Sequence, residues 1–210
     1  MSERQTAAVD RLLAAARATL AEMTHCWVMT PSASDGIHAR LVEPIAAAPD
    51  DEDWIISFAT SARSRKATEI ERAGRVTLGY ERHSDHSYVA LYARAALVVE
   101  RSAIRARWRE AWRLYFPGGP EDPNLIIVRL AVNRIEVCVP GVSPEPFGTR
   151  YVAAARDAAG AWTIASTETT CTGEMIHARL AALHRRPMRR CNFPGPFDPR
   201  RASIDRAGRR

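Results

Sequence analysis

The sequence predicts a mainly β protein of the α+β class, an antiparallel β-barrel with flanking helices. About seven or eight short segments are rich in β-branched and aromatic residues or alternate apolar with polar residues. Most connections between them have hairpin length, and helical patterns interrupt them at only two places. The 210 residues, 46% of them hydrophobic, are enough for one sizeable core. We therefore expect one barrel domain rather than a parallel α/β sheet.

The chain begins with an amphipathic helix followed by a β-hairpin. Residues 6–23 carry apolar side chains at three-and-four spacing, which places them on one helix face: Val9, Leu12, Leu13, Ala16 and Leu20. The period then changes to two over residues 25–30 and 37–42, and the segment between them contains Asp35-Gly36. This pattern predicts two antiparallel strands joined by a turn.

The middle of the chain predicts a third strand, a short helix and a two-stranded meander. Residues 54–60 form an apolar run bounded by polar residues, which predicts the strand. Residues 61–74 contain helix formers with a serine at the start and a glycine at the end. Residues 75–80 and 88–99 are rich in β-branched and aromatic side chains, and a polar loop separates these two predicted strands.

A second internal helix and four more strands complete the predicted barrel. Residues 102–115 return to helical spacing, and the Pro- and Gly-rich residues 116–123 end that helix. Its aromatic residues, Trp108, Trp112 and Tyr115, are expected in the core or at an interface. The remaining strands are expected over residues 124–131, 134–139, 151–155 and 162–166.

The net charge of +6 is concentrated at the C-terminal end. Ten arginines and two aspartates lie within residues 179–210, a net charge of +8 that leaves −2 for the residues before them. We expect residues 1–166 to form the barrel domain and the Arg- and Pro-rich residues 167–210 to form a loosely ordered extension. Because the extension lacks interleaved aromatic residues and amphipathic periodicity, a passive, solubilising role explains it as well as binding to RNA, membranes or acidic proteins does. A nucleic-acid partner is the least favoured hypothesis for the whole chain.

The cysteines and histidines predict neither disulfides nor a metal site. The four cysteines are scattered singly, without a Cys-x-x-Cys pair, and His83, Asp85 and His86 fit no common ligand set. Cys26 and Cys138 are expected to be small buried side chains rather than nucleophiles. No apolar run is long enough to span a bilayer, and the first residues lack a signal-peptide pattern. We expect a cytoplasmic protein without a metal or a membrane anchor.

The strongest candidate for chemistry is the segment 58–66, Phe-Ala-Thr-Ser-Ala-Arg-Ser-Arg-Lys, which joins a strand to a helix. A helix N-terminus presents unpaired amides and a positive dipole end, so it favours an anion. The hydroxyls of Thr60, Ser61 and Ser64 add hydrogen-bond donors for a phosphate monoester. So do Arg65 and Lys66, the only lysine beside 29 arginines. A serine that merely caps the helix, with the cations in solvent, explains the same pattern, and spacing alone leaves both interpretations open.

Three stretches resemble the FMN-binding split barrels of the pyridoxamine 5'-phosphate oxidase-like superfamily, near its general stress protein 26 branch. They are residues 58–70, the strand Arg40-Leu41-Val42, and residues 112–123, Trp-Arg-Leu-Tyr-Phe-Pro-Gly-Gly-Pro-Glu-Asp-Pro. Together they cover about residues 6–166. The resemblance implies a six- to eight-stranded antiparallel split β-barrel of Greek-key type with flanking helices. It also implies FMN as the cofactor and a homodimer with the flavin between the subunits.

The resemblance also implies which residues bind FMN. It places the phosphate on Arg65 and Lys66, and the backbone of residues 40–42 along the isoalloxazine ring. Tyr88 is expected near the flavin of the dimer partner, and Arg150 aligns with an arginine that faces the active site in the oxidases. The full expected set is Arg40, Leu41, Val42, Ala59, Thr60, Ser61, Ser64, Arg65, Lys66, Tyr88 and Arg150.

The implied activity is that of a small-molecule oxidoreductase, but the chain departs from the true oxidases. Cys138 stands where the oxidases tend to have a tryptophan, and Ala93 replaces a frequent glycine. Residues after Ser166 do not resemble the substrate-binding end of the oxidases. Oxidation of vitamin B6 is therefore not expected. A non-enzymatic flavin-binding or sensing module is the second hypothesis, and a nucleic-acid-associated barrel is the third.

Overall fold

The computed structural model describes residues 2–47, 51 and 53–165. The chain divides after Thr167 into two compact units, and the described residues lie in the first of them. The predicted Arg- and Pro-rich extension, 167–210, lies outside the described residues.

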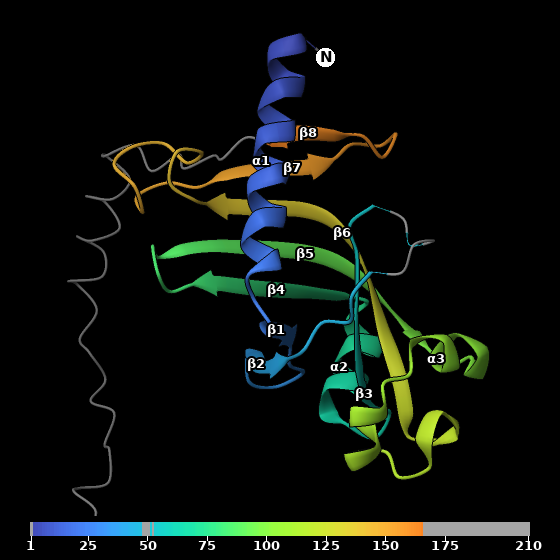
Figure 1. The fold of residues 1–210 in the computed structure, drawn as a ribbon. Helices are drawn as coiled ribbons and strands as arrows, with labels where there is room; N and C mark the ends of the chain where they lie inside the picture. Colours follow the sequence, from blue (N-terminus) through green and yellow to red (C-terminus); the bar gives the residue numbers. More distant parts are fainter. Residues whose placement is uncertain (1, 48–50, 52, 166–210) are drawn as a thin grey trace, which may run out of the picture. The chain divides into compact units, whose positions relative to one another are not determined.

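In the described part of the chain, eight strands form one antiparallel sheet (Figure 1). The order across the sheet is β2-β1-β4-β5-β6-β7-β8, and β3 pairs with β6. The strands are β1 Cys26–Pro31, β2 Ile37–Val42, β3 Ile55–Ser61, β4 Arg75–Arg82, β5 Ser87–Val98, β6 Leu125–Cys138, β7 Val152–Arg156 and β8 Trp162–Ala165. The prediction of a mainly β, antiparallel α+β fold with flanking helices is confirmed.

Strand β6 corrects the prediction of two separate strands over residues 124–131 and 134–139. It is one continuous strand, because a β-bulge accommodates the residue that interrupts its alternation. Tyr92 pairs with Arg134 and Ala93 pairs with Val132, so Asn133 is the extra residue and its side chain is exposed. On its other edge, β6 pairs with β3 before the bulge and with β7 after it. One strand, with the bulge between its two halves, therefore pairs with both β3 and β7.

Helix α1, Glu3–Ala21, packs its apolar face on the sheet and begins with a capping box between Ser2 and Gln5. Figure 1 shows it lying along the face formed by β4 to β8. Its buried residues are Val9, Leu12, Ala16 and Thr19, and the predicted Leu13 and Leu20 pack against the same core, partly buried. The predicted amphipathic helix is therefore confirmed, with its start three residues earlier than expected.

The predicted helix over residues 102–115 is wrong in its length. Helix α3, Arg101–Arg107, ends at Trp108, which has an extended ψ of 137°, and the 3-10 helices η1, Glu110–Leu114, and η2, Gly119–Glu121, follow. The break lets the Trp108 and Trp112 rings meet edge to face, 5.9 Å between centroids, against a small apolar cluster. Tyr115 is 73% exposed and therefore lies outside the core.

Two further sequence expectations concern membranes and thiols. No helix of the described part is long and apolar enough to cross a membrane. Cys26 and Cys138 are buried free thiols, as predicted. Burial raises the pKa of the Cys26 thiol to about 11, so this side chain stays protonated and unreactive at neutral pH.

Candidate phosphate-binding site

The candidate site lies where β3 ends and helix α2, Arg65–Ala73, begins. Ser64 caps the helix, because its hydroxyl accepts a hydrogen bond from the Ala67 amide at 3.1 Å. The Thr60 and Ser64 hydroxyls are 3.4 Å apart, so the end of the strand meets the cap. The amides of Arg65 and Lys66 lie in the first turn, where helix geometry supplies no acceptor for them. The capping interpretation therefore holds for Ser64 and leaves donors available beside it.

Three cations surround this helix start. The Arg65 side chain is exposed, whereas Lys66 is half-buried, with its Nζ atom 5.2 Å from the centroid of the Phe58 ring. Burial lowers the pKa of Lys66, and the nearby guanidinium of Arg40 lowers it further. Arg40 comes from β2, so the fold brings the cation of the first hairpin next to the two cations of the helix. The sequence-predicted proximity of Arg40, Arg65 and Lys66 is present in the structure.

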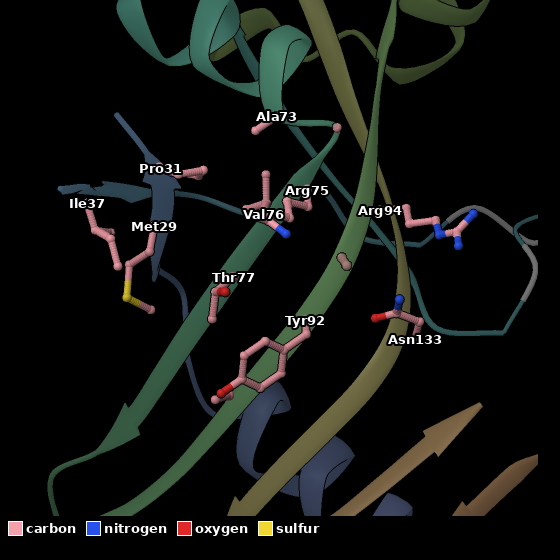
Figure 2. A pocket seen from close by; sticks show the side chains of 13 residues that line it. Met29, Pro31, Ile37, Ala73, Arg75, Val76, Thr77, Tyr92, Arg94 and Asn133 are labelled. Atoms are coloured by element: carbon pink, nitrogen blue, oxygen red, sulfur yellow. The ribbon is translucent and has the colours of Figure 1, made fainter. Parts of the chain in front are cut away.

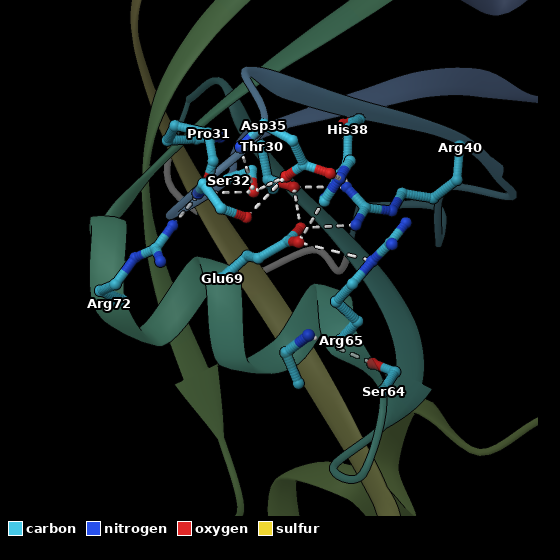
Figure 3. A network of polar contacts seen from close by, with 12 residues as sticks. Thr30, Pro31, Ser32, Asp35, His38, Arg40, Ser64, Arg65, Glu69 and Arg72 are labelled. Carbon is cyan, nitrogen blue, oxygen red and sulfur yellow. Dashed lines mark hydrogen bonds and ion pairs between the residues drawn. The ribbon is translucent and has the colours of Figure 1, made fainter.

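A buried carboxylate, Glu69, joins these elements (Figure 3). Its Oε2 atom accepts hydrogen bonds from the Thr30 hydroxyl and from Nη2 of Arg40, each at 2.6 Å. Its Oε1 atom contacts Nδ1 of His38 and lies 3.5 Å from Nε of Arg65. Burial alone would raise the pKa of the Glu69 carboxyl, but the hydrogen bonds from Thr30, Arg40 and His38 lower it to about 2. Glu69 is therefore an anion that organises the cations around it.

Sequence reasoning missed Thr30, His38 and Glu69. A signal was present, since Glu69 follows Arg65 by four residues, the spacing of an ion pair on one helix face. His38 and Arg40 are two apart on β2 and so share a face, and Thr30 is the register partner of His38. The spacing of residues did not predict that α2 packs against this hairpin.

The strand segment Arg40-Leu41-Val42 lies at the edge of the sheet. Register partners on β1 are Val28, Trp27 and Cys26, and β1 is the strand that pairs with β2 in the described part of the chain. The outer edge of β2 thus presents main-chain donors and acceptors. Val42 is buried and Leu41 exposed, as expected for alternation. Ala59, Thr60 and Ser61 are on β3 and pair with β6.

Tyr88 and Arg150 belong to a different part of the sheet. Tyr88 is the second residue of β5 and lies opposite Cys138, with β1 and β4 between β5 and β2. Arg150 precedes β7 and donates from Nη2 to the Glu145 carbonyl at 3.1 Å. Within one chain, neither residue joins the group at the start of α2. Their contact with a flavin stays a prediction that requires a second subunit.

A groove of about 910 Å³ lies on the sheet at the opposite end of α2 (Figure 2). Figure 2 shows side chains of β1, β4, β5 and β6 around it, including the bulged Asn133. Its lining contains Arg75 and Arg94, which are register partners, and no acidic side chain. Because Ala73 and Gly74 lie at its rim, the groove is next to the end of the helix rather than its cationic start.

The sequence profile described as pyridoxamine 5'-phosphate oxidase like matches residues 13–156. The chain belongs to this family. The match includes β1 to β6 and the whole start of α2, so the candidate phosphate site lies within the family's domain. This confirms the resemblance predicted from the sequence. Comparison with curated proteins gave no match.

Solved structures share the fold of this oxidase-like domain. A pyridoxamine 5'-phosphate oxidase-related, FMN-binding protein from Nostoc punctiforme is 15% identical, with a TM-score of 0.58 over 79% of this chain and 96% of its own. A protein related to general stress protein 26, from Clostridium acetobutylicum, is 10% identical, with a TM-score of 0.57 over 69% and 94% of the two chains. At these identities the likeness concerns the fold.

Proposed function

We propose that this protein binds FMN, with the flavin phosphate at the start of α2. The observation that carries the proposal is a half-buried Lys66 that lies near Arg40 and follows Arg65 in the chain, without a carboxylate partner of its own in the described residues. A phosphate monoester supplies the missing negative charge. Family membership and the Nostoc protein, whose name describes it as FMN-binding, support the choice of a flavin nucleotide.

The chain offers a distinct role for each part of the nucleotide. Arg65 and Lys66, with the hydroxyls of Thr60 and Ser61 and the first-turn amides of α2, would hold the phosphate. The free edge of β2 would hydrogen-bond the polar rim of the isoalloxazine ring through its backbone. Bound FMN would supply reversible electron transfer, which makes a small-molecule oxidoreductase the proposed class.

We propose a homodimer in which the flavin lies between the subunits. The β1–β2 hairpin exposes Trp27, Ile37 and Leu41, and Tyr88 is exposed on β5. Trp27 and Leu41 are register partners, so they form one apolar patch beside the proposed flavin edge. Burial of such a patch by a second copy would exclude water from the cofactor.

A non-enzymatic flavin-binding module is the second candidate. Cys138 occupies the position where the resemblance gives the oxidases a tryptophan, and its thiol is buried and faces the Arg150 carbonyl at 3.8 Å. This position therefore offers no aromatic ring to a substrate or a flavin. Steady consumption of NAD(P)H with an electron acceptor would favour the enzyme, and a bound flavin that stays inert would favour the module.

The double substitution Arg65→Ala with Lys66→Ala tests the phosphate site. Two charge-assisted hydrogen-bond donors are lost, so we expect the Kd for FMN to rise about 100-fold or more. The matched control is Arg63→Ala, which removes an exposed cation from the same connection and should leave the Kd unchanged. A folded double variant that binds FMN as tightly as the wild type would contradict the proposal.

A further inference from the structure

We propose that Glu69 is a positioning residue of the phosphate site. Its buried carboxylate would fix the Arg40 and Arg65 guanidinium groups so that an arriving phosphate meets them already in place. This inference rests on the proposed function and extends it to a residue that does not itself contact the ligand.

Glu69 connects three elements through one carboxylate. From α2 it reaches Thr30 on β1 and both His38 and Arg40 on β2, while Arg65 is four residues before it on its own helix. Arg40 is fixed further because its Nη1 atom contacts the Thr30 hydroxyl and donates to the His38 carbonyl at 2.9 Å. Both Nη atoms of Arg40 therefore have hydrogen-bond partners, and these partners fix the plane of its guanidinium group.

The depth of these side chains shows which of them a ligand would meet. The Glu69 side chain is 7% exposed, that of Arg40 is 20% exposed and that of Arg65 is 68% exposed. Figure 3 shows Glu69 at the centre of the network, with Arg40 and Arg65 on the same side of it. Arg65 approaches Glu69 through Nε, and its two Nη atoms have no partner among the described residues. The carboxylate thus lies beneath the cations and leaves donors facing outward.

The charges match a phosphate monoester. Arg40, Arg65 and Lys66 repel one another, and Glu69 neutralises one of the three charges, which leaves a surplus near that of a monoester dianion, about −1.5 to −2 at neutral pH. Without Glu69, repulsion from Lys66 would drive Arg40 toward solvent. FMN binding would then have to order Arg40 again, and this cost in conformational free energy would weaken the affinity.

Two interpretations of Glu69 predict opposite effects of its removal. If the carboxylate only adds a negative charge near the phosphate, its neutralisation strengthens FMN binding, because it removes a repulsion between the carboxylate and the phosphate. If it positions the arginines, its neutralisation weakens FMN binding. Riboflavin has the same ring without the phosphate, so a general loss of structure would lower both affinities, whereas a positioning effect is confined to FMN.

The experiment is titration of the purified full chain, stripped of flavin, with FMN and with riboflavin, in the wild type and Glu69→Gln. Glu71→Gln is the control, because Glu71 is exposed on the same helix. We expect the Kd of Glu69→Gln for FMN to rise about tenfold, with riboflavin affinity within about twofold of the wild type and Glu71→Gln unchanged. Thr30→Val removes a hydrogen bond to Glu69 without changing charge and should shift FMN affinity in the same direction by about two- to threefold.

The outcomes separate this inference from the function on which it rests. Unchanged or tighter FMN binding by Glu69→Gln overturns the positioning role, and so does an equal loss of both affinities. A wild type that binds FMN no better than riboflavin overturns the proposed phosphate site itself. If Glu69→Gln does not fold, Thr30→Val decides: a selective loss of FMN affinity supports the positioning role, and no selective loss overturns it.

Discussion

At the scale of single residues, Glu69 couples the site to the stability of the fold. A carboxylate this deeply buried costs free energy unless hydrogen bonds compensate it. Here Thr30, Arg40 and His38 compensate it so fully that the pKa of Glu69 lies at about 2 instead of its usual value of 4.5. The folded state therefore favours the charged form of this group.

The lowered pKa of Glu69 predicts a pH dependence of the free energy of unfolding. A carboxyl with a lower pKa in the folded state contributes stability above its unfolded pKa, and that contribution is lost as the pH falls from about 4.5 toward 2. We expect urea unfolding at pH 7, 5, 4 and 3 to show a steeper acid loss for the wild type than for Glu69→Gln. Asp35, whose pKa is also lowered to about 2, remains in both proteins but shares His38 with Glu69, so the difference between the two curves reports Glu69 together with this shared contact. Parallel curves would contradict the prediction.

At the scale of elements, helix α2 holds the site because both of its ends are well defined. Ser64 caps the start, and Gly74 ends the helix in a left-handed conformation with φ of +60°. The Gly74 amide donates to the Ile70 carbonyl, and its own carbonyl accepts from Ala95 of β5. The helix end is thereby attached to the sheet.

Substitution of Gly74 should destabilise the fold only because the new residue must adopt a left-handed backbone conformation. A Cβ atom at this position would meet nothing within 4 Å, so no clash contributes. We expect Gly74→Ala to lower the free energy of unfolding by about 1 kcal/mol, and Gly74→Asn to lower it less, because asparagine adopts left-handed geometry more readily. Urea unfolding of both variants measures the difference. Equal stability of Gly74→Ala and the wild type would show that the left-handed turn is not required.

Most of these elements form where their local sequence pattern predicts them. The first hairpin, β3, α2, β4 and β5 follow local patterns, with Asp35-Gly36 in the turn and serine and glycine at the helix ends. The errors occur where tertiary packing overrides the local pattern. The bulge at Asn133 joins two predicted strands, and a predicted helix breaks at Trp108, where the Trp108 and Trp112 rings meet edge to face.

The candidate site also contains residues that local spacing predicted and residues that only tertiary packing brings together. Local spacing identified Ser64, Arg65 and Lys66, because strand, cap and helix start are consecutive in the chain. Glu69 was not predicted as part of the site, since its partners Thr30 and His38 come from a distant hairpin. The spacing of Arg65 and Glu69 indicated one contact of this network, but its contacts with the hairpin depend on how α2 packs against β1 and β2.

At the scale of the whole molecule, the central question is whether two copies associate over the exposed hairpin. Trp27 is 48% exposed on β1, next to its partner Leu41. Ile164, on β8, is 45% exposed and provides a matched apolar position elsewhere on the same sheet.

Substitution of these residues tests the proposed dimer. We expect the wild type to sediment as a dimer, Trp27→Glu to sediment as a monomer because a charge would be buried unpaired, and Ile164→Glu to remain a dimer. Analytical ultracentrifugation distinguishes the species. A monomeric wild type, or a Trp27→Glu variant that is still dimeric, would remove the hairpin from the proposed interface.

The proposed function depends most directly on the presence of a flavin nucleotide. The decisive measurement is the visible absorption spectrum of the purified protein, followed by chromatographic identification of any cofactor released on denaturation. We predict a flavin spectrum and the release of about one FMN per chain, as expected for a single preformed phosphate site. A colourless protein that takes up no added FMN would contradict the proposed FMN binding.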